Sequence, residues 1–340
     1  VAEIEGVDLV FGADAKGNLF EYVNNMRGKS QPRVFSCGID QVNSFFQAFS
    51  SGDRTRSFLK VQDGCDYKCS YCTIPLARGR SRNIPIVEIV KEANLIAESG
   101  IKEVILTGVN IGDYGRTTGE SFFDLIKELD AVEGIERYRI SSIEPNLLTD
   151  EIIEFTAKSD KFLPHFHIPL QSGNNKILGL MRRRYRRELF AERIESIRRY
   201  SPDAFIGIDV IVGFPGETEE DFMDTYTFLE GLEPSYIHIF PYSERANTAT
   251  VLMDGKVSAN KITDRTKRLG DLCQRLHHQF YLNNIDKTSK VLFESTRRGG
   301  KMFGFTGNYI KVEVDYNQQL VGQVKLVKLL NILPDETMAM

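Results

Sequence analysis

Hydrophobic and polar residues alternate between residues 57 and 243 in two patterns that follow each other along the chain. Six runs are extended and largely apolar, which is typical of buried parallel strands: residues 58–61, 103–110, 138–145, 166–173, 205–215 and 236–243. Amphipathic stretches with helical spacing lie between them, at residues 87–99, 121–131, 149–158, 174–200 and 218–231. Because strands that alternate with helices form a parallel sheet covered by helices, the sequence predicts an α/β fold built on a partial (β/α)6 barrel.

Beyond residue 243 the pattern changes. Residues 260–287 form a basic stretch with helical spacing, and residues 290–333 alternate apolar and polar side chains with a period of two, interrupted by glycines. Short alternating strands with glycine turns predict a small β-barrel. Its basic loop contains Arg297, Arg298 and Lys301, with Phe303 and Phe305 nearby, and basic loops beside aromatic side chains commonly bind RNA. The alternative is a C-terminal barrel that only stabilises the protein.

Composition narrows the functional class. The chain has 340 residues, of which 41% are hydrophobic, and it is long enough for two or three domains with a sizeable core. It contains no run of about 18 apolar residues, so the sequence predicts no membrane span. No secretory signal is visible in the given sequence. Five cysteines, three of them clustered, argue against a disulfide framework and favour a reducing, cytoplasmic location.

Charge is unevenly distributed along the chain. The formal net charge is −4, which is not typical of a nucleic-acid-binding protein as a whole. Residues 182–199 nevertheless hold eight arginines against three glutamates, and residues 290–333 hold seven Lys or Arg against three acidic residues. Because charges act over only about 8–10 Å at physiological salt, these local surpluses predict contact with an anionic substrate. Residues 182–199 could instead form a solvated helix face with Arg–Glu pairs.

The strongest chemical signal is a group of three cysteines in one loop: Cys65, Cys69 and Cys72. Their spacing is C-x3-C-x2-C, and Tyr71 precedes the last cysteine. Three thiolates on a tight loop can bind three irons of a [4Fe-4S] cluster, which leaves the fourth iron free to bind S-adenosylmethionine. A zinc site is the alternative, and it would need a fourth ligand from Cys37, Cys273 or a histidine.

Polar residues also follow the predicted strands, where barrel enzymes place their reactive groups. The second strand ends at Gly108 and Asn110, the third at Glu144 and the fourth at Gln171, and Asp209 lies on the fifth. Asp209 or Gln171 taken alone would be ordinary loop chemistry. Together with the cysteine loop, which follows the first strand, these residues predict a pocket at one rim of the barrel.

With these motifs, the chain resembles the methylthiotransferase branch of the radical SAM enzymes over residues 1–335. The matching segments are 61–65, 72–75, 78–82, 169–173, 181–185 and 209–218, and residues 290–333 resemble the TRAM domain, the RNA-binding module of that family. Residues 106–115 (LTGVNIGDYG) are most similar to the threonylcarbamoyladenosine tRNA methylthiotransferases. The resemblance implies three parts: a remnant of the family's N-terminal domain with a linker (1–50), a radical SAM domain (51–285) and a TRAM domain (286–340).

The resemblance also implies a reaction and its cofactors. The cluster on the three cysteines would cleave S-adenosylmethionine to methionine and a 5′-deoxyadenosyl radical. That radical would remove the hydrogen from C2 of the modified adenine beside the anticodon of tRNA, where a methylthio group replaces it. An electron donor such as flavodoxin or ferredoxin would supply the electron. The residues implied to hold S-adenosylmethionine are Tyr71, Gly108, Asn110, Glu144, Gln171 and Arg184.

Members of this family carry three further cysteines for a second [4Fe-4S] cluster, and here residues 1–23 resemble only the end of the domain that bears them. We therefore expect the ligands of the second cluster upstream of Val1. Two other kinds of function stay open from the sequence. Related methylthiotransferases act on isopentenyladenosine in tRNA or on a ribosomal protein, and a non-catalytic iron–sulfur protein could bind RNA through the same basic loop.

Overall fold

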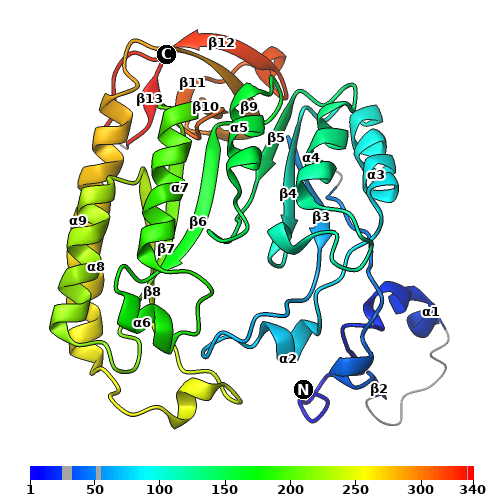
Figure 1. Ribbon diagram of the computed structural model, residues 1–340. Helices are drawn as coiled ribbons and strands as arrows, with labels where there is room; N and C mark the ends of the chain where they lie inside the picture. The colour runs from blue at the N-terminus through cyan, green and yellow to red at the C-terminus, as the bar shows by residue number, and fades with distance from the viewer. Residues whose placement is uncertain (25–32, 51–54, 335) are drawn as a thin grey trace.

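The computed structural model describes residues 1–24, 33–50, 55–334 and 336–340. Within them, six parallel strands form the inner wall of an open barrel (Figure 1): β3 (Arg56–Gln62), β4 (Glu103–Gly108), β5 (Arg137–Ile140), β6 (His165–Gln171), β7 (Phe205–Val212) and β8 (Tyr236–Pro241). Hydrogen bonds join them as β3-β4-β5 and β6-β7-β8. The two halves meet where the Ile143 amide donates to the His167 carbonyl at 3.1 Å. The predicted α/β fold class with a partial (β/α)6 barrel is confirmed.

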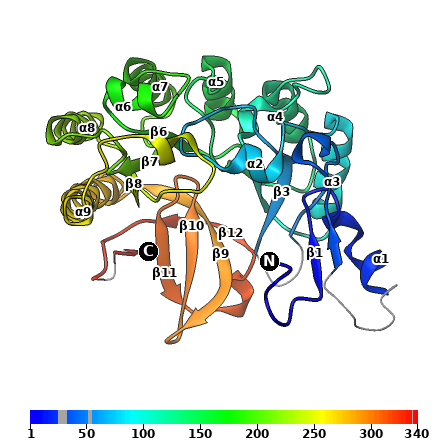
Figure 2. The same cartoon turned by 90° about the horizontal axis from the view of Figure 1, so that it is seen from below.

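Helices cover the outer face of these strands (Figure 2): α3 (Ile86–Glu98), α4 (Phe122–Asp130), α5 (Asp150–Lys158), α6 (Asn175–Leu180), α7 (Arg187–Tyr200), α8 (Glu219–Leu232) and α9 (Ala259–Leu282). Four of them begin at a side-chain cap, because Ser121, Thr149, Asn174 and Thr218 each accept a hydrogen bond from an amide of the first turn. The buried faces of the helices and the strands share one core, which holds the strand ends in place. None of the described helices is long and apolar enough to cross a membrane.

The predicted helical stretch 174–200 is divided into α6 and α7. Between them Arg182 has a left-handed φ of 57°, and Tyr185 turns into the core. A left-handed arginine is uncommon and has no sequence signature, so the pattern alone could not predict the break. The break brings residues 181–186 to the cysteine loop, where the Ser70 amide donates to the Met181 carbonyl at 3.1 Å.

The C-terminal residues form a curled five-stranded sheet, which confirms the predicted small barrel-like domain. Its strands are β9 (Thr288–Arg298), β10 (Lys301–Thr306), β11 (Lys311–Asp315), β12 (Val324–Lys328) and β13 (Met338–Ala339), in the order β12-β9-β10-β11-β13. The register shifts between Met302 and Gly304, and a Cβ on Gly304 would lie 2.5 Å from the Val291 side chain. Such an irregularity bends a sheet and helps it to curl. The sheet has a core of its own around Phe293.

Buried charges join this sheet to the amino-terminal ends of β4 and β5. Glu103 is fully buried and pairs with Arg137 at 2.8 Å and with Arg139 at 3.3 Å. The same arginines donate to the carbonyls of Phe305 at 3.2 Å and Gly307 at 3.0 Å. Because a buried carboxylate needs partners, this network fixes the C-terminal sheet against one end of the barrel. The carboxyl-terminal ends of the strands point to the opposite end, toward α2 (Ile74–Arg78) and α6 (Figure 1).

The N-terminal residues form a small α/β unit. β1 (Leu9–Phe11) and β2 (Arg33–Phe35) pair in parallel, and α1 (Leu19–Asn24) lies between them in the sequence. The rings of Tyr22 and Phe35 pack with centroids 4.2 Å apart. The predicted domain limits at residues 50 and 285 stay predictions, and the first adjoins residues 51–54, which lie outside the described residues.

Candidate active site

The cysteine loop connects β3 to α2 at the carboxyl-terminal end of the barrel. Backbone hydrogen bonds close it at both ends: the Asp63 and Arg82 backbones bond each other at 3.0 and 2.8 Å, and the Cys65 amide donates to the Gly79 carbonyl at 3.0 Å. Gly64 has a φ of 68°, and a Cβ on it would lie 1.9 Å from the Arg80 carbonyl oxygen. Only glycine therefore fits before the first cysteine.

The three predicted cluster ligands face one cavity of about 160 Å³. Its lining comes from the cysteine loop, from the ends of β4 and β5 and from the segment before α7: Cys65, Tyr67, Cys69, Tyr71, Cys72, Ile74, Val109, Asn110, Ser142, Glu144 and Arg183. Of the predicted S-adenosylmethionine-binding residues, Tyr71, Asn110 and Glu144 are thus brought to the cysteines. A cavity thus lies at the predicted rim, but Gln171 and Asp209, which the sequence also placed there, do not line it.

The spacing of the three sulfurs favours a cluster over a single zinc ion. Among the described residues, His167, Asp209 and His238 form the one group of three or more such side chains whose ligand atoms all lie within 4.8 Å of one another. The cysteine sulfurs are spread more widely than that. Tetrahedral zinc, with bonds of about 2.3 Å, would hold thiolates about 3.8 Å apart. Cys273, which could have been a fourth zinc ligand, is instead buried on α9. Its sulfur accepts a hydrogen bond from the amide of Ile237 on β8 at 3.2 Å.

Each cysteine sulfur already has a hydrogen-bond donor. The Tyr67 amide donates to Cys65 and the Ile74 amide to Cys72, both at 3.4 Å. Arg183 Nη1 donates to Cys69 Sγ at 3.3 Å. Burial raises the pKa of the Cys65 thiol to about 11 and also raises the pKa of Cys69, so these two thiols are protonated near neutral pH in the absence of metal. Metal binding therefore releases protons, and the donors then stabilise the thiolates.

Arg183 is the central cation of the cavity. It forms an ion pair with Glu144 and donates to the Tyr71 and Tyr185 hydroxyls at 3.4 and 3.1 Å. Burial opposes its charge, but the neighbouring Tyr185 and Glu144 hold the pKa of Arg183 well above its usual value. Burial raises the pKa of Glu144, although Arg183 acts against this rise. The cavity therefore offers one buried cation beside one carboxyl group.

Arg184, the arginine that the sequence favoured, lies outside this cavity. It is exposed, its guanidinium sits 3.8 Å from the centre of the Tyr67 ring, and it donates to the Asp66 carbonyl at 3.3 Å. Three arginines follow one another at 182–184, and only the left-handed turn at Arg182 decides that Arg183 points inward. The motif at 181–185 located the segment that reaches the cavity but gave no signal for which of its arginines lines it.

The remaining predicted residues mark the same rim. Gly108 has a φ of 156° at the end of β4, and a Cβ there would lie 2.4 Å from the Gln62 carbonyl oxygen. Asn110 is left-handed, its Nδ2 lies 3.9 Å from Cys65 Sγ, and its buried Oδ1 has no hydrogen-bond partner among the described residues. Gln171 ends β6 with a φ of 66°, but it does not line the cavity. Asn110 thus presents a free acceptor beside the cysteines.

The predicted RNA-binding residues lie on the β9–β10 hairpin. Gly299 and Gly300 have φ values of 58° and 80°, which fits the tight turn favoured in hairpins. Arg297 lies over the Tyr316 ring at 4.9 Å, and Arg298 is exposed. Lys301 forms an ion pair with Asp315 at 2.9 Å, so its charge is partly compensated.

The two phenylalanines near this hairpin face different surroundings. Phe303 is covered by the ammonium group of Lys311 at 4.0 Å from the ring centre. Phe305 points to the barrel instead, where it stacks on Tyr309 at 5.0 Å and lies under the guanidinium of Arg56. Phe305 therefore serves the contact between the C-terminal sheet and the barrel, and a role of the aromatic rings in RNA binding stays a prediction.

Comparison with known proteins gives consistent matches. Residues 59–229 match the family model of the radical SAM superfamily. The chain is 38% identical over 340 residues to the threonylcarbamoyladenosine tRNA methylthiotransferase MtaB of Bacillus subtilis (strain 168), covering 97% of this chain and 75% of that protein. It is 34% identical over 332 residues to a tRNA-2-methylthio-N(6)-dimethylallyladenosine synthase of Campylobacter jejuni, covering 96% and 75%. A solved structure of coproporphyrinogen III oxidase from Escherichia coli, described as a radical SAM enzyme, is 14% identical with a TM-score of 0.47, covering 66% of this chain and 53% of that chain.

Proposed function

Because the chain belongs to the radical SAM superfamily and, within it, to the tRNA methylthiotransferases, we propose that it adds a methylthio group to C2 of N6-threonylcarbamoyladenosine in tRNA. The observation that carries this proposal is the identity of 36–38% to three proteins named for that substrate. These matches cover 92–97% of this chain. Proteins named for dimethylallyladenosine reach 35%. Threonylcarbamoyladenosine is therefore the favoured substrate.

We assign Cys65, Cys69 and Cys72 as the ligands of a [4Fe-4S] cluster with one open iron. When bound, this group supplies the electron that cleaves S-adenosylmethionine and so starts radical chemistry at an unactivated C–H bond. The donor set fits it, because three thiols converge on one cavity and each sulfur has a hydrogen-bond donor. The fit extends to Asn110, whose unpartnered Oδ1 can accept from a ligand in the same cavity.

The charges of the cavity match S-adenosylmethionine, which carries an ammonium, a carboxylate and a sulfonium. In the proposed complex Arg183 binds the carboxylate, and Glu144 faces the cationic groups. Tyr71 fixes the arginine through its hydroxyl and packs edge-on against Phe214, with ring centroids 6.0 Å apart. This assignment replaces Arg184 by Arg183 and keeps Tyr71, Asn110 and Glu144 in their proposed roles, with Gly108 and Gln171 shaping the rim.

Two further components belong to the proposal. The methylthio group requires a sulfur source, for which we propose a second [4Fe-4S] cluster with three cysteine ligands in addition to those at 65, 69 and 72. Cys37 and Cys273 do not form such a set, because Cys273 is engaged by the backbone of Ile237. We also propose that a flavodoxin or ferredoxin donates the electron, and that the anticodon loop of tRNA is bound with help from Arg297 and Arg298 in the cytoplasm.

The proposal is tested on tRNA from cells whose gene for this protein is deleted. Nucleoside mass spectrometry should show that the 2-methylthio derivative of threonylcarbamoyladenosine disappears while threonylcarbamoyladenosine accumulates. The 2-methylthio derivative of dimethylallyladenosine should be unchanged, which serves as the internal control. If the 2-methylthio derivative of dimethylallyladenosine disappears instead, dimethylallyladenosine is the substrate. If neither 2-methylthio derivative changes, the protein acts on a protein substrate or has a non-catalytic role.

A further inference from the structure

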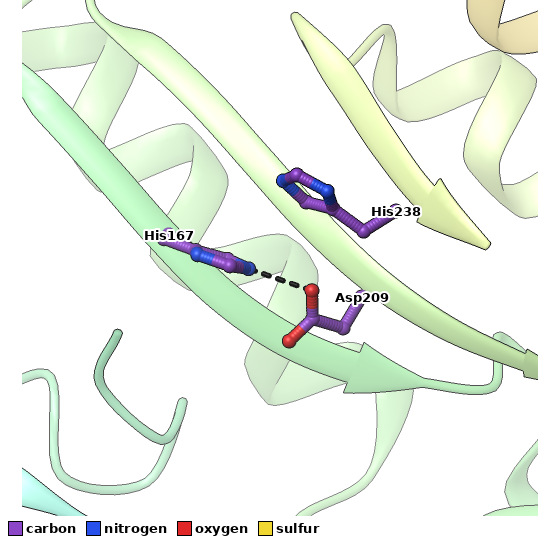
Figure 3. Close-up of side chains that lie close together, drawn as sticks. All are labelled: His167, Asp209 and His238. Atoms are coloured by element: carbon purple, nitrogen blue, oxygen red, sulfur yellow. Dashed lines mark hydrogen bonds and ion pairs between the residues drawn. The ribbon is translucent and has the colours of Figure 1, made fainter. Parts of the chain in front are cut away.

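Three neighbouring strands place two imidazoles and one carboxylate together inside the barrel, in a group that the cysteine chemistry does not use. Figure 3 shows His167 on β6, Asp209 on β7 and His238 on β8, with their side chains on the same side of the sheet. His167 Nε2 and Asp209 Oδ1 are 2.6 Å apart. All three ligand atoms lie within 4.8 Å of one another.

The strand register explains this convergence. Asp209 of β7 pairs directly with His238 of β8. His167 of β6 pairs with Gly207, which precedes Asp209 by two residues on β7 and so faces the same side of the sheet. β7 separates β6 from β8, so their backbones are roughly 10 Å apart, at about 4.8 Å per strand step. The two imidazole centroids are nevertheless only 4.9 Å apart. Gly207 has no side chain beside the His167 ring, where a Cβ would lie 3.9 Å from His167 Cδ2.

A hydrogen-bonded His–Asp pair alone does not account for the arrangement. Such a pair would explain His167 and Asp209, but not why His238 leans toward them. Among the described residues, the His238 ring has stacking contacts with His167 and Tyr236 and no hydrogen bond. A half-buried imidazole that forms no hydrogen bond with the described residues therefore lies close to a carboxylate and a second imidazole.

We propose that His167, Asp209 and His238 bind one divalent transition-metal ion of the zinc or iron(II) type. Two histidines and one carboxylate are the donor set that such ions prefer, at metal–ligand distances of about 2.0–2.2 Å. Ligands of one ion at that distance lie roughly 3.0–3.5 Å apart. The structure needs only small side-chain movements to reach this, with the His167–Asp209 contact widening and His238 approaching.

The site lies deeper in the barrel than the cysteine cavity. His167 precedes the end of β6 at Gln171 by four residues, which is about 13 Å of strand. Both histidines line a separate cavity of about 580 Å³, which also contacts Phe305 and Tyr309 of the C-terminal domain. Three protein ligands leave at least one coordination position of the ion free, and that position can open to this cavity.

The experiment uses the full chain with the three cluster cysteines replaced by serine, so that thiolates do not compete for the metal. Anaerobic titration with Co²⁺ should give one ion per chain, with visible ligand-field bands of nitrogen and oxygen ligands, and Zn²⁺ should displace it. His167→Ala and His238→Ala should each weaken Co²⁺ binding by more than about 100-fold. Removing a residue that only orients a metal ligand already lowers metal affinity by about 10- to 100-fold, and these variants remove a ligand itself. His278→Ala is the matched control, since His278 is exposed on α9, and it should bind like the parent.

His238→Gln provides a second, milder variant, and circular dichroism of each metal-free variant establishes that it is folded. Metal analysis of the cluster-loaded wild-type protein should then show one ion beyond the four irons of the cluster. If the parent binds no stoichiometric Co²⁺, or if the His167 and His238 variants bind it as well as the His278 variant, the metal site is refuted. The proposed tRNA reaction is unaffected by that outcome, because no step of the titration involves tRNA or S-adenosylmethionine.

Discussion

Replacing Arg183 by methionine tests which of the three consecutive arginines belongs to the active site. Methionine keeps an unbranched, flexible side chain, although a shorter one, and removes the charge. The Arg183 side chain is 4% exposed and that of Glu144 is 15% exposed, so the change leaves a nearly buried carboxyl group without its partner. Removing one member of a buried pair costs about 3–5 kcal/mol. Because Glu144 keeps some contact with water, we expect a loss near 3 kcal/mol, at the lower end of that range.

The size of this loss should depend on pH. Burial already raises the pKa of Glu144 in the native protein, and without Arg183 that pKa rises further. A carboxyl group with a raised pKa favours the folded state below its unfolded pKa, and this contribution is lost as the pH rises through its folded pKa. The deficit of the variant should therefore be smallest near about pH 4, where Glu144 is protonated, and larger at about pH 7.

Urea unfolding of the metal-free chain measures the stability, and equilibrium dialysis of the cluster-loaded protein measures the dissociation constant for S-adenosylmethionine. A lost charged hydrogen bond of about 1.5–3 kcal/mol corresponds to an increase of about 10- to 100-fold in that constant. Arg184→Met is the matched control, and as an exposed substitution it should change stability by less than about 0.5 kcal/mol and leave the constant unchanged. The reverse pattern, with binding lost only in the Arg184 variant, would refute the assignment.

Three further predictions concern the cysteines, the hairpin and the domain contact. Cys69→Ala should abolish both the cluster absorption and the cleavage of S-adenosylmethionine, whereas Cys37→Ala should retain both; iron analysis that showed the opposite would contradict the ligand assignment. Neutralising Arg297, Arg298 and Lys301 should weaken tRNA binding. The slope of the logarithm of the binding constant against the logarithm of the salt concentration should fall by about 2, roughly one for each arginine, because Lys301 is already paired with Asp315. Cleavage of S-adenosylmethionine without tRNA should persist, and an unchanged tRNA dissociation constant would overturn this role. Glu103→Gln should lower the free energy of unfolding by about 3–5 kcal/mol, against less than about 1 kcal/mol for Glu136→Gln in the exposed Lys102–Glu136 pair, and equal effects in urea would contradict the buried network.

The sequence predicted those features that depend on local pattern. Strand periodicity located all six barrel strands, and the cysteine spacing located the loop that faces the cavity, because both are encoded within a few residues. The orientation of Arg183 depends on a left-handed turn at Arg182, which has no sequence signature. The approach of His167 to His238 depends on the register of three strands, and a periodic pattern does not contain register.

The position of Phe305 shows the same limit at the level of domains. The period of two along β10 places Phe303 and Phe305 on one face of the strand. It does not reveal that Arg56 of the barrel covers Phe305, whereas Phe303 is covered by Lys311 of the neighbouring strand β11. Contacts between domains arise from the packing of surfaces far apart in the sequence, and a local pattern carries no information about them.

The most direct test of the proposed reaction follows the hydrogen atom at C2. The protein, loaded with its cluster, is incubated anaerobically with reductant, S-adenosylmethionine and tRNA whose threonylcarbamoyladenosine carries deuterium at C2. Mass spectrometry should detect that deuterium in the 5′-deoxyadenosine product, and tRNA with deuterated dimethylallyladenosine should transfer none. If 5′-deoxyadenosine forms without deuterium from threonylcarbamoyladenosine, this adenine is not the substrate of the radical site and the central claim is contradicted.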